Sequence, residues 1–159
     1  MVNRTFIVTA ALSLIGLASV PARAGISDCL GTWEGSGSAT EVSGKDLGAF
    51  TVSLTRRTIG TAKVRADGKV TLANGQEIVF WQEFEDHGQS GFKLVSNNGA
   101  GGGHCFANGI CQSYEQRTDG HAFATTIAKD GADKLRVLIT ELDSGKAVRF
   151  FQQTLSKKP

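Results

Sequence analysis

Tight-turn dipeptides recur along this chain at short intervals, and they constrain its fold more than any other feature. Asp-Gly or Asn-Gly occurs at positions 67–68, 74–75, 108–109, 119–120 and 130–131, and Asp-Ser-Gly at 143–145. These pairs favour hairpins because their central residues tolerate a positive φ. Between them lie short runs in which apolar and polar residues alternate, as in Ala49–Arg56. The spacing therefore predicts consecutive antiparallel β-strands.

The alternating runs are numerous enough to predict an all-β domain. They are Gly31–Ser38, Ala49–Arg56, Thr61–Ala66, Lys69–Ala73, Gln76–Glu85, Gly91–Ser96, Gly103–Ala107, Ile110–Arg117, His121–Ala128, Lys134–Leu142 and Ala147–Ser156. An open sheet of this size would have two bare edges, and closure removes both. We expect an antiparallel up-and-down β-barrel of about 8–10 strands. A two-sheet sandwich is the alternative, although it would usually need longer crossovers between sheets.

The first 24 residues have the features of a secretory signal peptide. Arg4 precedes an apolar run from Phe6 to Val20, and Ala22 and Ala24 supply the small residues of a cleavage site. A membrane anchor is the alternative, but it needs about twenty apolar residues. We expect cleavage near Ala24, a single domain over residues 25–159, and a periplasmic or secreted protein.

Charge gives no reason to expect a nucleic-acid or lipid partner. The chain has 17 Lys and Arg residues against 15 Asp and Glu, and Arg4 and Arg23 lie in the signal segment. The remaining domain is therefore balanced, so no attraction to polyanions is expected. No second apolar stretch in the sequence is long enough to span a membrane.

Two cysteines flank an Asn-Gly pair in the segment GGGHCFANGICQ, residues 101–112. In an oxidising compartment we expect a disulfide between Cys105 and Cys111. A three-residue loop, 107–109, would place them opposite each other with Gly109 in the left-handed position. A two-residue loop, 108–109, would turn them to opposite faces, which reduced thiols allow. A bond from Cys29 to one of them is the remaining alternative.

The same segment is a poor match to a metal site. Structural zinc sites usually combine cysteines spaced by two to four residues with a second ligand pair. Here His87, His104 and His121 are scattered, and we expect no metal. If the disulfide forms, Cys29 is expected to be a small buried residue, because nothing near it in sequence marks an activated thiol.

The first predicted strand begins Gly-Thr-Trp-Glu-Gly-Ser-Gly at Gly31. A glycine two residues before a tryptophan on an opening strand resembles the signature of the calycin superfamily, the lipocalin-like barrels. The whole stretch also looks like the first strand of nitrobindin-like small bacterial barrels. The resemblance implies that Trp33 closes the barrel floor beneath a basic side chain from the last strand, a position that Arg149 matches. Such a pair would gain about 0.5–2 kcal/mol by cation–π attraction. The alternative is that Trp33 is simply the largest core residue.

Other properties of these families are not expected here. Nitrobindin-like proteins hold haem through a histidine late in the chain, whereas the last histidine here is His121. Avidins share a similar first strand but need several tryptophans around the ligand, and this chain has only Trp33 and Trp81. We therefore expect no cofactor.

The sequence contains no clear catalytic pattern. The nucleophile elbow G-x-S-x-G is missing, and residues 87–91 approach it only superficially. Glu83, Glu85 and Asp86 could suggest paired carboxylates, but a solvated strand edge running into a polar turn is the preferred interpretation. Gly99–Gly103 lacks the Lys-Ser/Thr of a phosphate loop, and we expect a flexible loop at the barrel mouth. An enzyme is therefore not the favoured interpretation.

Two features favour binding instead. Gln76–Glu85 and Lys134–Leu142 are apolar on both faces, so another segment, a subunit or a macromolecule is expected to cover the outside. Gly35 and Gly37 lie on the same face of the predicted strand as Trp33 and would leave space inside the barrel, although phenylalanines could fill it. A barrel of this size can enclose one small apolar ligand.

Two functions remain open from the sequence. The favoured one is an exported, non-enzymatic carrier of a small hydrophobic ligand, with candidate contacts at Trp33, Phe80, Gln82, Tyr114 and Thr125. The alternative is a protein-binding module or inhibitor of the cell envelope that acts through its surface loops. Its candidate epitope is Gly99–Gly103, beside the cysteine hairpin. A hollow interior would favour the carrier, and a solid one the surface binder.

Overall fold

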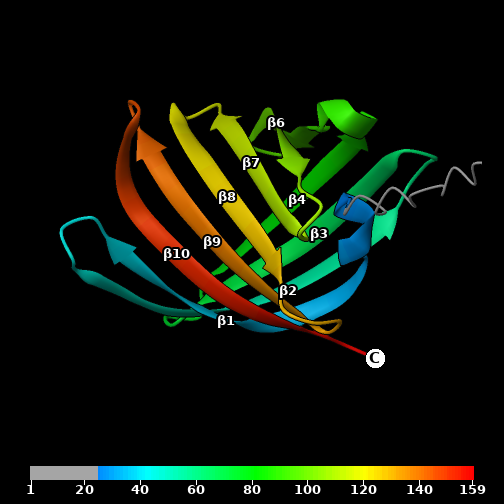
Figure 1. Ribbon diagram of the computed structural model, residues 1–159. Helices are drawn as coiled ribbons and strands as arrows, with labels where there is room; N and C mark the ends of the chain where they lie inside the picture. The colour runs from blue at the N-terminus through cyan, green and yellow to red at the C-terminus, as the bar shows by residue number, and fades with distance from the viewer. Residues whose placement is uncertain (1–24) are drawn as a thin grey trace, which may run out of the picture.

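Ten antiparallel strands form one closed barrel in the computed structural model, which describes residues 25–159 (Figure 1). The predicted signal segment, residues 1–24, lies outside these residues. A short 3-10 helix, η1 (Ile26–Cys29), precedes the first strand. The strands are β1 (Gly31–Glu41), β2 (Asp46–Thr58), β3 (Lys63–Leu72), β4 (Glu77–Asp86), β5 (Phe92–Ser96), β6 (Gly99–Cys105), β7 (Ile110–Arg117), β8 (His121–Lys129), β9 (Lys134–Asp143) and β10 (Lys146–Lys157), and a second 3-10 helix, η2 (Gly88–Ser90), lies between β4 and β5.

Closure of the barrel occurs between the first and last strands. β1 pairs with β10 from Trp33 opposite Lys157 to Glu41 opposite Arg149. Every other strand pairs with its neighbours in sequence, so the topology is up-and-down. The predicted all-β antiparallel barrel is confirmed, at the upper end of the expected number of strands.

Most of the predicted turns are present. Gly75, Gly109, Gly120, Gly131 and Gly145 all have positive φ values between strands. The turn predicted at Asp67-Gly68 is wrong, because both residues lie inside the continuous strand β3. Gly68 is needed there for a different reason, the close approach of an aromatic ring described below.

The glycine-rich segment is also a strand rather than the predicted loop. Residues 99–105 form β6, which pairs with β5 on one side and β7 on the other. The backbones of β6 and β7 come very close, since a Cβ at Gly101 would lie 2.9 Å from Cα of Glu115 and overlap the Tyr114 carbonyl. Glycine therefore permits a tightly coiled part of the sheet rather than mobility.

One end of the barrel is closed by packed side chains. Trp33, Leu94, Leu135 and Leu155 are the largest fully buried side chains, and all lie toward the end where η1 covers the barrel. Indole Nε1 of Trp33 donates a hydrogen bond of 3.0 Å to the carbonyl of Cys29, which ties η1 to β1. The other end carries the turns after β1, β3, β5, β7 and β9.

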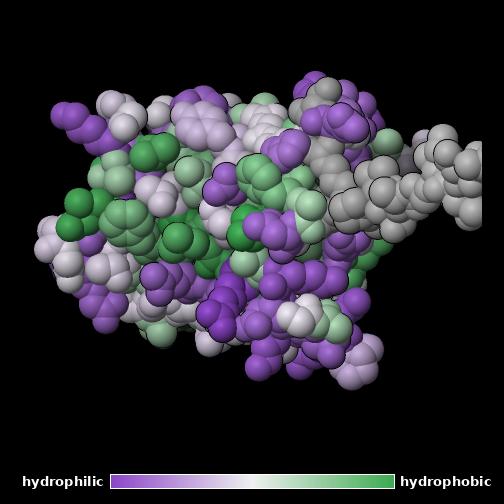
Figure 2. Space-filling view, viewed as in Figure 1, coloured by the Kyte–Doolittle hydropathy of each residue, from purple (hydrophilic) through white to green (hydrophobic). Residues whose placement is uncertain are grey.

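Apolar side chains are also exposed on the outside of the barrel. Val79 is 70% exposed and Leu138 43%, so no described segment covers the second apolar face that the sequence predicted for β4 and β9. Figure 2 shows hydrophobic surface over the side of the barrel formed by β8 to β10. Unlike Val79 and Leu138, Trp81 has a side chain packed against it, because the guanidinium of Arg65 lies 4.8 Å from its ring centroid.

Candidate functional site

The inward faces of the strands enclose a cavity of about 820 Å³. It extends from Arg56, near the closed end, to the turns at the opposite end of the barrel. Much of its wall is apolar, including Val52, Phe80, Ile127, Val137, Ile139 and Phe151. The sequence left a filled interior and a hollow one open, and the structure has a hollow one.

The cavity exists partly because aromatic rings pack closely against glycines. The Phe50 ring covers Gly37, where a Cβ would lie 2.6 Å from ring carbon Cζ, and the Phe80 ring covers Gly68 in the same way. The sequence suggested that Gly37 leaves empty space above itself, but the Phe50 ring occupies that space. Gly37 allows Phe50 to lie against the wall, which keeps the ring out of the lumen.

A buried carboxylate forms a polar patch on one wall. Glu115 accepts hydrogen bonds from the Ser96 hydroxyl at 2.6 Å and from the Gln82 amide at 3.0 Å. These three residues come from β7, β5 and β4. The two donors satisfy both carboxylate oxygens, so the patch is a fixed polar feature of the lumen.

A second charged group lies at the open end. Glu141 is buried, with His121 Nδ1 at 3.0 Å from one carboxylate oxygen and Arg149 Nη1 at 3.4 Å from the other. All three line the cavity. Arg149 is thus part of the mouth and pairs with a carboxylate there.

The predicted packing of Arg149 over Trp33 is therefore wrong. Antiparallel pairing places Arg149 opposite Glu41, at the other end of β10 from Trp33. The cation above the Trp33 ring is Lys157, whose Nζ lies 5.7 Å from the ring centroid. The floor has the predicted composition, an indole beneath a basic side chain of the last strand, but a different residue supplies the base.

Arg56 is the polar residue deepest in the cavity, and the sequence analysis missed it. Its residue exposure is 5%, and its Nε and Nη1 atoms have no hydrogen-bond partner. Burial lowers the pKa of Arg56, and the hydrogen-bonded Cys29 side chain opposes that shift. The sequence did contain an indication of its position. Side chains alternate along β2, and Arg56 falls on the same side of the strand as the inward-facing Val52 and Leu54.

The five predicted ligand contacts fall in three places. Phe80, Gln82 and Thr125 line the cavity. Trp33 is fully buried at the closed end and is not among the lining residues. Tyr114 is on the outer face, where its hydroxyl donates to Gln116, so it is not part of the proposed site. Ligand contact at the first three stays a prediction.

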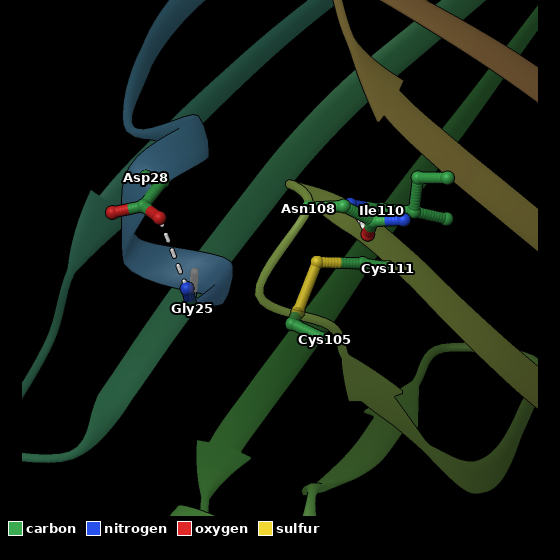
Figure 3. The surroundings of a disulfide bond; sticks show 6 residues. All are labelled: Gly25, Asp28, Cys105, Asn108, Ile110 and Cys111. Carbon is green, nitrogen blue, oxygen red and sulfur yellow. Dashed lines mark hydrogen bonds between the residues drawn. A yellow bond between two sulfur atoms is a disulfide. The ribbon is translucent and has the colours of Figure 1, made fainter. Parts of the chain in front are cut away.

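The disulfide between Cys105 and Cys111 is present, and it joins residues that pair directly across the β6–β7 hairpin (Figure 3). The three-residue loop 107–109 accompanies it, with Gly109 at φ 82° and the Phe106 amide bonded to the Ile110 carbonyl. The geometric argument from the sequence is confirmed. Cys29 is a free, buried thiol.

The carboxylates near the end of β4 form ion pairs along the outside. Glu83 accepts a hydrogen bond of 2.8 Å from Arg65, and Glu85 lies 3.1 Å from Lys63 Nζ. The pKa of Glu85 is lowered, chiefly because Lys63 donates a hydrogen bond to it. Within residues 25–159, no group of three or more potential ligands is placed to hold a metal ion. No helix in that part of the chain is long and apolar enough to cross a membrane.

Comparison with known proteins identifies the fold. No protein-family profile and no curated protein matches the sequence. Among solved structures, the chain is similar to the S-type phycobiliprotein lyase CPES from Guillardia theta, with a TM-score of 0.68 at 10% identity over 84% of this chain and 90% of that one. Rv2717c from M. tuberculosis gives a TM-score of 0.62 at 14% identity, covering 84% of this chain and 94% of that one.

A redesigned β-barrel, mFAP1, bound to DFHBI, is also similar, with a TM-score of 0.50 at 12% identity over 86% of this chain and 100% of that one. At such identities the likeness concerns the fold. The fold and the cavity together define this chain as a lipocalin-like closed β-barrel with a hollow interior.

Proposed function

We propose that this protein is an exported, non-enzymatic binding protein that carries one small hydrophobic molecule inside its barrel. The observation that carries the proposal is the cavity of about 820 Å³ in the barrel interior. Small-molecule sites usually measure about 300–1,000 Å³ and combine apolar walls with a few placed polar groups. The Glu115 patch and Arg56 are such groups here.

Two further observations support the proposal. The cysteine hairpin is disulfide-bonded, which suits the oxidising compartment that a cleaved segment over residues 1–24 would give access to. The solved barrel mFAP1 is bound to DFHBI, so a barrel of related shape can accommodate a small ligand. We also propose, from the first strand and its buried Trp33, that the chain is a member of the calycin superfamily.

The test is a fluorescence titration with the neutral apolar probe N-phenyl-1-naphthylamine, which we expect to saturate near one probe per chain. Two neighbouring residues of β8 give a matched pair of variants. Thr125 lines the cavity, whereas Thr126 lies opposite Gln112 and Leu138 on the outer face. Thr125→Trp places an indole in the lumen and should weaken binding at least about tenfold, by loss of roughly 1.4 kcal/mol or more of apolar contact.

Thr126→Trp adds the same indole outside and should leave the affinity for the probe unchanged. Equal effects of the two substitutions would mean that the probe binds the exposed apolar surface instead. No saturable binding of this or any other apolar probe would remove the carrier function.

One observation favours the alternative, a protein-binding module. Tyr114 on β7, Leu138 on β9 and Phe150 on β10 are exposed on the outer face, and exposed apolar surface is typical of contact sites. The predicted loop epitope at Gly99–Gly103 is replaced by this surface, because that segment is strand β6. Leu138→Asp should abolish recovery of a protein partner from envelope extract if this alternative holds, and should not affect probe binding in the lumen.

A further inference from the structure

Arg56 is a buried cation that forms no ion pair with a carboxylate of the described residues. No carboxylate in the described part of the chain lies within 4 Å of its guanidinium, and two of its nitrogens have no hydrogen-bond partner. The neighbour that favours its charged form is the side chain of Cys29, a free thiol. Buried arginines are normally paired with an anion or with several acceptors, because an isolated buried charge is strongly unfavourable.

The carboxylates of the lumen are engaged elsewhere. Glu115 accepts hydrogen bonds from Ser96 and Gln82, and Glu141 is close to His121 and Arg149 at the open end. Each has its own partners on its own part of the wall. Asp119, a third carboxylate of the lining, lies 3.3 Å from Arg117. Among residues 25–159 no carboxylate is therefore left for Arg56, although the guanidinium borders the cavity.

The surroundings of Arg56 specify the rest of the ligand. On β2 the inward residues between Arg56 and the open end are Leu54, Val52 and Phe50, and all three line the cavity. A molecule that reaches Arg56 from the mouth thus lies along an apolar wall. Only a terminal group would meet the guanidinium.

We propose that Arg56 is the anion-binding group of this cavity, and that the ligand is an apolar molecule with one terminal oxyanion, most simply a carboxylate. This inference rests on the proposed carrier function. The planar guanidinium presents several N–H groups in a fixed geometry, which matches the two oxygens of a carboxylate or sulfonate. A neutral ligand of the same shape would leave the guanidinium unpaired, so the site discriminates in favour of the acid.

The test compares two probes that differ in a single group. The anion 1-anilinonaphthalene-8-sulfonate carries a sulfonate that N-phenyl-1-naphthylamine lacks, and the aromatic body is the same. The measured quantity is the ratio of their affinities for the full chain and for two variants. Arg56→Met removes the guanidinium and keeps an apolar side chain of similar length, and Arg57→Met removes the next arginine of β2, whose side chain is exposed on the outside and pairs with Asp67.

We expect Arg56→Met to lower the sulfonate-to-neutral affinity ratio by about 10- to 100-fold, the range for hydrogen bonds to charged groups. Affinity for the neutral probe should change less than about threefold. Arg57→Met should leave the ratio unchanged. Without ligand, Arg56→Met should melt at or above the wild-type temperature, because removing an unpaired buried charge is neutral or stabilising.

Each other outcome has a definite meaning. If neither probe binds the wild-type chain, the carrier function itself fails. If both bind and the ratio is insensitive to Arg56→Met, the carrier survives and the anion site is refuted. An equal loss in Arg57→Met would assign the effect to general positive charge, which also refutes the site. Should Arg56→Met not fold, Arg56→Gln serves instead, and competition by dodecanoate against dodecanol in the wild type gives the same comparison without a variant.

Discussion

Gly68→Ala is the substitution that most directly tests why the barrel is hollow. A Cβ at Gly68 would lie 2.6 and 2.8 Å from two carbons of the Phe80 ring, whereas ordinary contacts are longer than about 3.4 Å. The φ of Gly68 is not in the left-handed region, so alanine meets no backbone strain there. The whole effect must come from the ring, which has to move inward by roughly 1 Å.

The expected cost is that of overpacking, about 1–3 kcal/mol, which corresponds to a fall of roughly 3–12 °C in Tm for a domain of this size. The displaced ring also narrows the lumen, so affinity for N-phenyl-1-naphthylamine should fall together with stability. Both quantities are measured on the same sample, by thermal denaturation and by titration. Gly60→Ala is the control, because the nearest atom to its added Cβ is 4.0 Å away.

A double substitution separates the ring from every other cause. In a Phe80→Leu background the overlap disappears, and Gly68→Ala should then cost less than about 0.5 kcal/mol, which gives a coupling energy of 0.5 kcal/mol or more between the two sites. The same cost in both backgrounds would refute the idea that Gly68 exists to seat Phe80. It would also remove the structural reason given for the empty lumen.

Two more predictions concern the outside of the barrel and its hairpin. Cys105→Ser with Cys111→Ser should lower the free energy of unfolding by about 2 kcal/mol, the loop-closure value for a sequence separation of 6, and reduction of the wild type by dithiothreitol should match it in urea denaturation. Because Lys63 lowers the pKa of Glu85, this pair stabilises the fold above the unfolded-state pKa, and that contribution is lost as pH falls through the folded-state pKa. Lys63→Met should raise the Glu85 pKa toward its ordinary value in an NMR titration, and the stabilities of the two proteins should converge in acid.

The strand pattern was predictable because hydrophobic alternation and turn chemistry are local. The two errors in the strand pattern, a turn at Asp67-Gly68 and a loop at Gly99–Gly103, both arose from glycine, which can serve a turn or permit a close contact. In Asp67-Gly68 and in Gly99–Gly103 it was interpreted as a residue for turns and mobile loops. In the structure it admits a ring at Gly68 and a neighbouring backbone at Gly101, and both are contacts between segments that local sequence does not encode.

The partner of Trp33 could have been derived from the predicted topology alone. In an antiparallel pair the start of one strand lies beside the end of the other. Trp33 is near the start of β1, so its neighbour must be near the end of β10, which is where Lys157 lies. Arg149 is near the start of β10 and could only reach the opposite end of the barrel. The resemblance suggested the kind of residue, and strand direction determines which one.

Arg56 shows how a site residue can be overlooked when sequence is judged by composition. It lies in the polar stretch Thr55–Thr58, which has the composition of a solvated strand end. However, side chains alternate along a strand, so Arg56 faces the same way as Phe50, Val52 and Leu54, into the barrel. In a filled barrel such a side chain would have neither water nor a counter-ion, and the fold would lose several kcal/mol. The cavity gives Arg56 access to an exchangeable anion, so a hollow lumen and an inward arginine are explained together by one charged ligand.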